Sequence, residues 1–378
     1  MRILIIAGGF LPAQKYGGPV VSIDNLCTLL DDEFYVVARN HDLGEQKKLE
    51  GISQGWNIRS NCKVLYLQDS ECKYKRFMEI FCEVSPDIVY LNSLFSATFI
   101  IPVLSICKRK KCPVLLAPRG QLCAGAMKKK YKKIPYIIYL RLSGLIKNVY
   151  FQSTSNEETA AITKYLHIKK DKIFFLTNVP SIPSKFCGGQ EKKEGIGRFV
   201  FLSRIHPKKN LLLAIKCFEE VKGKVIFDIY GPIEDTEYWE KCQNEILKLP
   251  SNIKVSYGGL VSHEMVHQIF EKYDAFVFPT FSENYGHVIA ESLIVGTSVI
   301  ISDQTPWTDI NDVGAGWAIP LGNIEKYEEA LQTIVDMSQS EYDQLRKRCK
   351  NFCLKKVELN EIKDCYKRSF VSIVEGKK

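Results

Sequence analysis

The sequence predicts an α/β fold of two doubly wound domains, each with a parallel sheet between layers of helices. The chain has 378 residues, which is more than one hydrophobic core usually supports. Short apolar segments alternate with amphipathic segments in both halves of the chain. The alternation stops once, at 181–197, where glycines, prolines and a charged run indicate a linker. We therefore expect two domains that face each other across a cleft.

The first half is expected to form an N-terminal domain at residues 1–190. Its predicted strands are short, continuously apolar and rich in Val and Ile, the pattern of parallel strands buried on both faces. These strands cover 2–7, 33–38, 62–66, 87–91, 113–117, 149–152 and 172–176. Amphipathic helices are expected between them at 19–30, 73–83, 96–108 and 155–166.

The same pattern predicts a second Rossmann-like domain at residues 191–355. Its strands are expected at 198–203, 224–230, 253–257, 275–279 and 298–302. Its helices are expected at 210–221, 238–247, 262–272, 287–295, 326–337 and 341–353. The last segment, 354–374, also has a helical period, and we assign 356–378 to a separate C-terminal helix.

Composition excludes several classes of protein. Hydrophobic residues make up 46% and charged residues 25%, which is typical of a globular chain and not of a disordered one. The 13 cysteines are odd in number and scattered, without a CxxC pair, so we expect a reducing cytoplasm and no zinc ribbon. The first apolar run is too short for a secretory signal. The uncharged stretch 88–107 is interrupted by polar residues and a proline, which favours a strand, a turn and a helix over a membrane span.

Positive charge is concentrated in one region. The net charge is +9, but the segment between Asp87 and Glu157 holds twelve basic residues and no acidic one, which leaves 9 − 12 = −3 for the rest of the chain. Its densest part, 127–142, mixes lysines with aromatic and aliphatic residues, as suits a helix lying on an anionic membrane. A solvated face over a core helix is the alternative. Nucleic-acid binding is disfavoured because no recognition module accompanies the patch.

The first candidate site is a glycine turn after the first strand. In Gly17-Gly18-Pro19 the glycines let the backbone approach a ligand closely, and proline suits the first turn of a helix. The N-terminus of that helix would favour a phosphate. Since the segment is not GxGxxG, a nicotinamide or flavin site is poorly supported. A plain tight turn is the alternative.

The second candidate site follows the first strand of the second domain. Arg204 and Lys209 flank one loop, 203–210, at the carboxyl edge of the predicted sheet, where α/β folds bind ligands. Two fixed cations suit a diphosphate, with arginine as a bidentate fork and lysine as a compact charge. Ordinary surface cations are the alternative.

The third candidate site is a pair of glutamates. Glu283 lies in the loop after a predicted strand, and Glu291 follows eight residues later, about two turns into the next helix. A carboxylate can accept hydrogen bonds from two neighbouring hydroxyls of a sugar or ribose. The backbone amides of 284–287, at the start of the helix, can donate to an anion. Capping and surface glutamates are the alternative.

Together these motifs resemble the family-four retaining glycosyltransferases of the GT-B fold, in their bacterial surface-polysaccharide subgroup. The resemblance covers nearly the whole chain. Besides the three sites above, Pro118-Arg119-Gly120 is similar to the acceptor-side PHG or PRG segment of that subgroup, and Thr305-Pro306-Trp307 is similar to its TPW element. The resemblance implies that the final helix crosses back to the first domain.

The resemblance also implies the role of each matched residue. It places the donor diphosphate on Arg204 and Lys209, the ribose on Glu291, and the sugar hydroxyls and phosphate on Glu283 with the amides that follow it. Arg119 stands where many relatives have histidine, and a purely structural arginine is the alternative there. We expect catalytic roles for Arg204, Lys209, Glu283 and Arg119. We expect donor-binding roles for Gly17, Gly18, Arg204, Lys209, Asn284, Tyr285, Gly286 and Glu291.

The expected reaction needs no metal and no cofactor. The sequence has no DxD motif, so two cations and a helix dipole would stabilise the leaving diphosphate in place of a metal. The expected mechanism retains the anomeric configuration, with a leaving diphosphate oxygen taking the acceptor proton on the same face. The implied substrates are a nucleotide-sugar donor and a glycan acceptor, lipid-linked because of the basic region 108–147, in O-antigen or capsule-type biosynthesis.

The expected location is the cytoplasm, with peripheral attachment to the inner face of the cytoplasmic membrane through region 108–147 and no nucleic acid bound. Two other functions stay open. One is a nucleotide-sugar epimerase on a similar frame, for which Asp303, His206 and His287 are the acid–base candidates. The other is a non-catalytic basic protein that binds membranes or nucleic acid.

Overall fold

The computed structural model describes residues 1–13, 15–59, 61–123, 126–127, 130–183, 188 and 190–376. It divides the chain into two compact units. The N-terminal unit comprises Met1–Val179 and Leu359–Lys378, and the C-terminal unit comprises Pro180–Glu358. The boundary falls at 179/180 instead of the expected 190/191. Its position reflects packing: Val179 belongs to the core of the first unit, whereas the buried Lys192 donates to Val335 O in the second.

The N-terminal unit contains an eight-stranded sheet with the order β3-β4-β2-β1-β5-β6-β7-β8. Its strands are β1 (Arg2–Ile6), β2 (Glu33–Arg39), β3 (Trp56–Arg59), β4 (Cys62–Leu67), β5 (Ile88–Asn92), β6 (Val114–Ala117), β7 (Val149–Ser153) and β8 (Ile173–Phe175). All neighbours are parallel except β3, which is antiparallel to β4. The order reverses beside β1, so the carboxyl ends of β1 and β5 form the switch point at which such sheets bind ligands.

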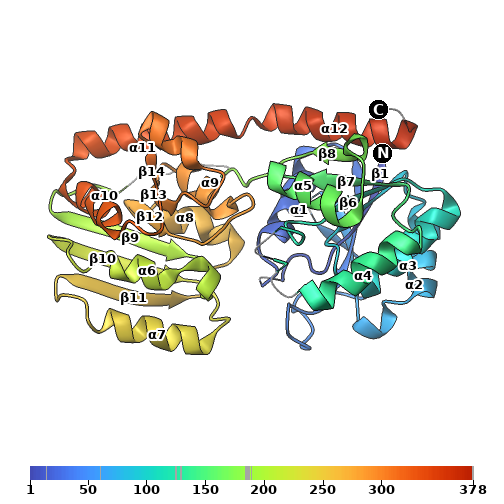
Figure 1. Ribbon diagram of the computed structural model, residues 1–378, viewed down its shortest axis with the longest axis horizontal. Helices are drawn as coiled ribbons and strands as arrows, with labels where there is room; N and C mark the ends of the chain where they lie inside the picture. The colour runs from blue at the N-terminus through green and yellow to red at the C-terminus, as the bar shows by residue number, and fades with distance from the viewer. Residues whose placement is uncertain are drawn as a thin grey trace. The chain divides into compact units, whose positions relative to one another are not determined.

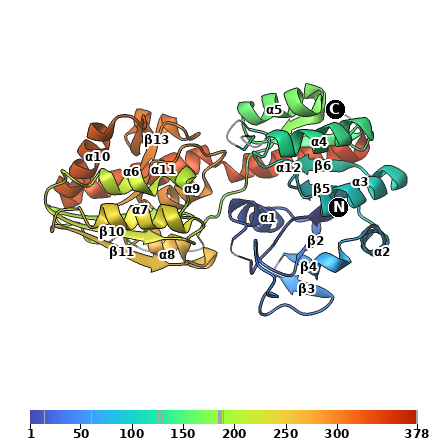
Figure 2. The same cartoon turned by 60° about the horizontal axis from the view of Figure 1, so that its bottom comes forward.

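Helices cover both faces of this sheet (Figures 1 and 2). They are α1 (Gly18–Leu29), α2 (Tyr74–Val84), α3 (Ala97–Lys110), α4 (Lys130–Leu142), α5 (Asn156–Leu166) and α12 (Leu359–Glu375). One core joins the sheet to α2, α3, α4 and α5. The other joins it to α1 and to α12, which contributes Tyr366, Phe370 and Ile373. The unit therefore includes a helix that follows the whole C-terminal unit in the sequence.

The C-terminal unit contains a six-stranded, wholly parallel sheet with the order β11-β10-β9-β12-β13-β14. Its strands are β9 (Ile196–Leu202), β10 (Lys224–Tyr230), β11 (Ile253–Gly259), β12 (Ala275–Phe278), β13 (Ser298–Ser302) and β14 (Gly316–Ile319). Its helices are α6 (Leu211–Lys216), α7 (Thr236–Ile246), α8 (Val266–Phe270), α9 (His287–Ile294), α10 (Ile324–Asp336) and α11 (Gln339–Lys356). Since β9 and β12 are neighbours, the loops that follow them meet at one edge.

Most predicted elements are confirmed, including the strand, turn and helix at 88–107. Two strands were not predicted. The edge strand β3 exposes 87% of Ile58 to solvent, so it lacks the buried pattern. The strand β14 is mostly buried, but its sequence Gly-Trp-Ala-Ile has only one β-branched residue. The predicted helix 210–221 ends early, at Lys216, and 262–272 begins as a 3₁₀ turn, His263–Met265, before α8. The predicted linker lies partly outside the described residues, at 184–187 and 189.

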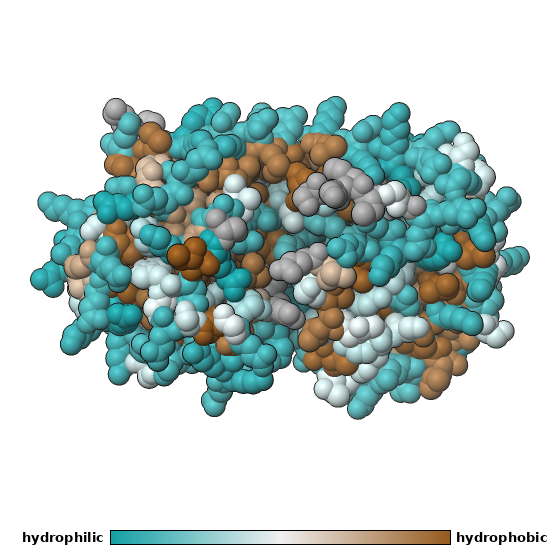
Figure 3. All heavy atoms as spheres, turned by 180° about the vertical axis from the view of Figure 1, so that it is seen from behind, coloured by the Kyte–Doolittle hydropathy of each residue, from teal (hydrophilic) through white to brown (hydrophobic). Residues whose placement is uncertain are grey.

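Within the described ranges, no helix is both long and apolar enough to cross a membrane. Apolar side chains are mostly buried: the face shown in Figure 3 is largely hydrophilic, with smaller apolar areas between the polar residues. The apolar side chains therefore show the ordinary distribution of a folded α/β chain, in which some apolar residues stay exposed.

Candidate functional site

The two predicted motif loops of the C-terminal unit meet at the carboxyl edge of its sheet. The loop 203–210 follows β9, and the loop 279–286 follows the neighbouring strand β12. The Phe281 N–H donates to Lys208 O at 3.0 Å, and Thr280 Oγ1 donates to the same carbonyl at 3.1 Å. These bonds hold the two loops together, and they bring Lys209 of one loop beside Glu283 of the other.

Lys209 and Glu283 form an ion pair between these loops. The Lys209 ammonium donates to Glu283 Oε1, and the two side chains are only 12% and 15% exposed. The ammonium also lies 5.3 Å from the centre of the Phe278 ring. Because water has little access, the charges act strongly on any group placed beside them. The structure thus brings together two residues that the sequence placed 74 positions apart.

Arg204 is the more exposed cation of the site. Its Nη1 lies 3.0 and 3.1 Å from the two carboxylate oxygens of Glu234, and its side chain is 44% exposed. Glu234 comes from the loop after β10, which is fixed to the Arg204 loop by two backbone bonds: Ile205 N–H to Pro232 O at 2.8 Å, and Glu234 N–H to Ile205 O at 3.2 Å. The guanidinium therefore stands at the rim of the edge, where it can turn toward an anion.

A glycine makes this loop pairing possible. Gly231 has φ +135°, and a Cβ at that position would lie 1.9 Å from Ser203 O. No side chain fits there, because the backbone of the loop after β10 presses directly on the peptide that leads to Arg204. The sequence alone did not predict that Gly231 has a role in holding Arg204.

The start of α9 carries the third motif. Gly286 precedes the helix with φ +79°, and a Cβ there would lie 2.9 Å from Ile289 Cδ1. The Ile289 and Ala290 N–H groups donate to Gly286 O at 2.9 and 3.3 Å and close the first turn. The N-terminus of a helix favours a negative charge, so this turn suits the predicted phosphate. Burial raises the pKa of the Tyr285 phenol well above its usual range, so this hydroxyl stays neutral.

The TPW element acts as a brace for this loop. The Trp307 side chain is 1% exposed, and its Nε1 donates to Tyr285 O at 2.6 Å. Just before it, Gln304 O accepts from the Glu283 N–H at 3.1 Å. Sequence comparison marked the element only as a resemblance, because nothing in its residue types reveals a contact with a loop about twenty residues earlier.

Glu291 lies in α9 as an almost completely buried carboxylate, 4% exposed. Its Oε1 has no hydrogen-bond partner in the part of the chain that the structure describes, and His263 Nδ1 lies 3.6 Å from it. Burial raises the pKa of Glu291 to about 7. The side chain is thus a hydrogen-bond acceptor with unused capacity, which suits a pair of ligand hydroxyls and is costly to leave without them.

The remaining predicted residues lie in the N-terminal unit. Gly17 is the N-cap residue of α1 and has φ +67°. A Cβ added to Gly17 would have no heavy atom within 4 Å. Gly18 is the first residue of the helix. Pro19 lies in the first turn as expected. The backbone here is open enough for the predicted phosphate approach, which stays a prediction. The positive φ of Gly17 explains the choice of glycine at that position.

Arg119 is fully engaged with neutral groups of its own unit. Its guanidinium donates to Asn92 Oδ1 at 2.9 and 2.6 Å, to Tyr90 OH at 3.0 Å, to Ser22 Oγ at 3.4 Å and to Asn178 Oδ1. These partners come from β5, α1 and the segment after β8. With its five N–H groups occupied, Arg119 acts as a fixed positive charge that joins these elements. Its predicted catalytic role is not tested by this geometry.

The sequence is similar to one protein family and to a curated relative. Residues 188–352 match the family model described as "Glycosyl transferases group 1". The O-antigen chain mannosyltransferase RfbU of Salmonella typhimurium strain LT2 is 26% identical over 183 residues, covering 45% of this chain and 49% of RfbU. The chain thus spans about half the length of this curated relative.

Solved structures resemble the whole chain. Anabaena Alr3699/HepE in complex with UDP and glucose has a TM-score of 0.73 at 12% identity, covering 98% of this chain and 100% of that one. The trehalose-6-phosphate synthase OtsA has a TM-score of 0.71 at 10% identity, covering 98% and 99%. The lipopolysaccharide outer core galactosyltransferase WaaB has a TM-score of 0.59 at 16% identity, covering 98% and 100%. At these identities the likenesses establish the fold.

Proposed function

We propose that this chain, whose residues 188–352 form a group 1 glycosyltransferase domain on the GT-B fold, transfers a sugar from a nucleotide-diphosphate donor to a glycan acceptor in polysaccharide biosynthesis. One observation carries the proposal: Lys209 and Glu283 form an ion pair between the loops that follow two neighbouring parallel strands, within the matched residues. Arg204 lies on the same loop as Lys209, and Glu291 lies in the helix that follows Glu283. The named activity of RfbU and the UDP and glucose bound to HepE support it.

The proposed donor site divides the nucleotide sugar among these residues. Glu291, with its unused acceptor, receives the ribose hydroxyls. Arg204 and Lys209 balance the charge that grows on the diphosphate as it leaves. Glu283 and the amides at the start of α9 hold the sugar and the adjoining phosphate. Catalysis in this scheme is mainly positioning and charge stabilisation, because the largely buried Lys209, Glu283 and Glu291 are held in place before the reaction begins and only Arg204 has to turn toward the anion.

Removing either cation tests this scheme. We expect Arg204→Ala and Lys209→Ala each to lower kcat by about 10²–10³, the usual cost of losing one preorganised donor to a developing charge. Lys216→Ala is the matched control, since Lys216 is a lysine of the same unit on α6, outside the site. Rates of donor hydrolysis without acceptor give the measurement. Unchanged kcat in both site variants would count against the scheme.

The finer chemistry is part of the proposal. We expect retention at the anomeric carbon, because a leaving diphosphate oxygen can take the acceptor proton on the same face. We also expect activity without a metal, since the two cations replace it electrostatically. Proton NMR of the first-formed product gives its anomeric configuration, and assays with EDTA and added Mg²⁺ give the metal dependence. An inverted product, or activity lost in EDTA and restored by Mg²⁺, contradicts these expectations.

We propose peripheral attachment to an anionic membrane at the inner face of the cytoplasmic membrane, through region 108–147. Lys128 and Lys129, which the prediction included, lie outside the described residues. Four apolar or aromatic side chains of α4 are exposed to solvent: Tyr131, Ile138, Tyr139 and Leu142. Basic residues end the neighbouring α3, so the region combines apolar and cationic groups as a membrane surface requires.

Vesicle binding tests the membrane proposal. We expect Leu142→Glu to reduce sedimentation with phosphatidylglycerol vesicles and to leave donor hydrolysis unchanged. Leu247→Glu is the matched control, because Leu247 is also 83% exposed but lies in the other unit. Equal binding to phosphatidylglycerol and to phosphatidylcholine vesicles, or equal binding by both variants, refutes it.

Nucleotide binding is the first measurement for the whole proposal. We expect UDP, GDP or ADP to raise the melting temperature, since ligand at 100 times its Kd adds about 2.7 kcal/mol of stability. Glu291→Ala should abolish the shift. Glu329→Ala, an exposed glutamate on α10, should preserve it. No shift with any nucleotide or nucleotide sugar would overturn the proposal.

A further inference from the structure

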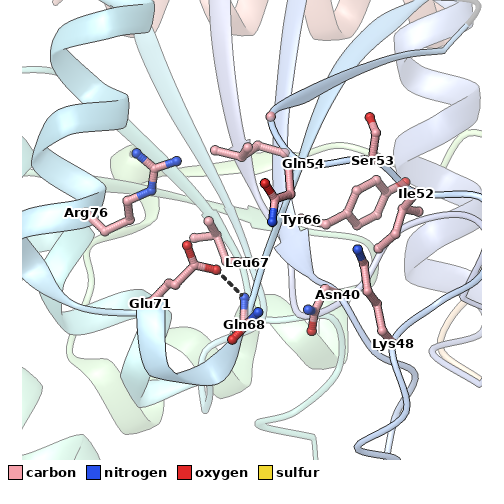
Figure 4. Close-up of a pocket in the computed structure, with 12 residues that line it drawn as sticks. Asn40, Lys48, Ile52, Ser53, Gln54, Tyr66, Leu67, Gln68, Glu71 and Arg76 are labelled. Carbon is pink, nitrogen blue, oxygen red and sulfur yellow. Dashed lines mark hydrogen bonds between the residues drawn. The ribbon is translucent and has the colours of Figure 1, made fainter.

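A polar pocket lies entirely within the N-terminal unit, beside the parallel pair β2 and β4 (Figure 4). Its volume is about 300 Å³. Its walls come from the ends of β2 and β4, from the loop 48–55, and from the segment that leads into α2. It therefore lies at the carboxyl edge of the sheet, where α/β folds bind ligands, and its volume is at the small end for a ligand site.

Several polar groups of the pocket make no hydrogen bond to the protein. Within the described ranges, the side-chain amides of Asn40 and Gln54 and the Lys48 ammonium have no such partner. The Nε of Arg76 is buried without a partner, although its Nη1 lies 3.3 Å from Glu79. Residues with unused donor groups thus line one small space from three segments of the chain: the end of β2, the loop 48–55 and α2.

The other polar residues of the pocket are already engaged. Glu71 accepts from the Gln68 N–H at 2.9 Å, the bond drawn in Figure 4, and the two residues cap each other at the turn before α2. Their role is to fix the wall. The unused groups are therefore distinct from those that hold the pocket in shape.

The chemistry of the walls favours a sugar ring. A side-chain amide donates and accepts, as the hydroxyls of a pyranose do, and Asn40 and Gln54 supply two such groups. Leu65 and Ile52 provide apolar surface of the kind that the C–H groups of a sugar cover. Lys48 and Arg76 stand on opposite sides of the pocket (Figure 4), so they do not converge on a single phosphate.

The pocket is fixed to the segment that leads to the glycine turn. Tyr66, on its wall, donates its hydroxyl to Leu11 O. The Lys15 N–H donates to Asp42 Oδ1 at 3.0 Å, and the Lys15 ammonium pairs with Glu45 at 2.6 Å, in the loop that continues to Lys48. The pocket wall is thus bonded to the segment before Gly17, although that segment does not itself line the pocket.

We propose that this pocket is a saccharide subsite that takes one pyranose unit of the glycan acceptor. Asn40 and Gln54 bind its hydroxyls, Lys48 and Arg76 contact its two ends, and Leu65 and Ile52 pack against its ring. That the ligand is a saccharide is argued from the residues of the pocket. That this saccharide is part of the acceptor rests on the proposed function.

Saturation-transfer NMR on the full chain tests the subsite. The probes are methyl α-D-mannopyranoside, methyl α-D-glucopyranoside and methyl β-D-galactopyranoside. We expect at least one of them to receive saturation, and we expect Gln54→Ala and Asn40→Ala each to weaken its binding about tenfold, the cost of one lost hydrogen bond of ordinary strength. Gln46→Ala is the matched control, an exposed amide on the same loop outside the pocket, and should bind as the unaltered chain does.

Hydrolysis of UDP-, GDP- and ADP-sugars, measured in parallel, separates this inference from the proposed function. Intact hydrolysis with weakened glycoside binding in the two pocket variants alone supports the subsite. Intact hydrolysis with no saturation of any probe, or with equal binding in all variants, overturns it. Glycoside binding that depends on Gln54, in a chain that neither binds nucleotides nor hydrolyses any donor, keeps the subsite and rejects the transferase.

Discussion

At the scale of single residues, Glu291 is expected to make nucleotide binding depend on pH. Its pKa is raised to about 7 by burial, from an ordinary value of 4.5, and the ionised form is the better acceptor for ribose hydroxyls. We expect nucleotide affinity to fall as the pH drops through 7. Calorimetric titration from pH 5.5 to 8.5 measures it. In Glu291→Gln the affinity should be weak and flat across this range.

The raised pKa of Glu291 also makes the stability of the unliganded chain depend on pH, and this dependence runs opposite to that of nucleotide affinity. Between pH 4.5 and 7 the folded chain holds a proton on Glu291 that the unfolded chain has lost, so the free energy of unfolding falls as pH rises. The full contribution is at most about 3 kcal/mol. Glu291→Gln should remove that slope in urea denaturation without ligand. His263→Gln is the control for the neighbouring imidazole, and a slope lost there instead would assign the effect to His263.

At the scale of elements, the loop after β12 is held in place by Trp307, which lies about twenty residues later in the sequence. Trp307→Phe keeps an aromatic ring but loses the bond to Tyr285 O, so we expect a loss of about 1–3 kcal/mol in stability and a higher KM for the donor. Urea denaturation and donor hydrolysis measure the two effects. Trp317→Phe, on β14, is the control, since its indole has no hydrogen bond to any described residue. Similar changes in both variants would argue against the brace.

The predictability of elements follows their burial. Strands such as β5, buried at all five positions, are recognisable as apolar runs. The charges of the loops after β9 and β12 marked them as candidate sites, but the ligands were assigned only through the resemblance to a known family. The edge strand β3 lacked that signal because one of its faces meets solvent. Contacts between distant segments, such as Trp307 with Tyr285, leave no local pattern in the sequence. The pocket around Gln54 was missed for the same reason, since its walls come from four separate segments.

At the scale of the whole molecule, the C-terminal unit is one continuous stretch of the chain, whereas the N-terminal unit is made of two separate stretches. The donor residues Arg204, Lys209, Glu283 and Glu291 lie in the continuous stretch Pro180–Glu358, so we expect a fragment of this stretch to fold and to be stabilised by the same nucleotide as the full chain. A fragment ending at Val179 lacks α12, whose Tyr366 bonds to Thr177 O and Gln152, and should aggregate. Size-exclusion chromatography and circular dichroism of both fragments provide the measurement.

Joining 359–376 to the fragment 1–179 through a flexible linker is the matched control. The joined fragment should be monomeric and folded, because it restores Phe370 and Ile373 to the core around β1 and β5. A well-folded fragment 1–179 without the helix would show that α12 is not needed for this core.

The position of α12 in the sequence also orders events during translation. The sheet of the N-terminal unit is synthesised first, yet the helix that closes one of its faces emerges only after all of Pro180–Glu358. At about 5–20 residues per second, the ribosome takes roughly 10 to 40 s to cover that distance. For that interval the apolar face that awaits Tyr366 and Phe370 is open on a nascent chain whose C-terminal unit can already fold. The part of the protein that is made first is therefore completed last.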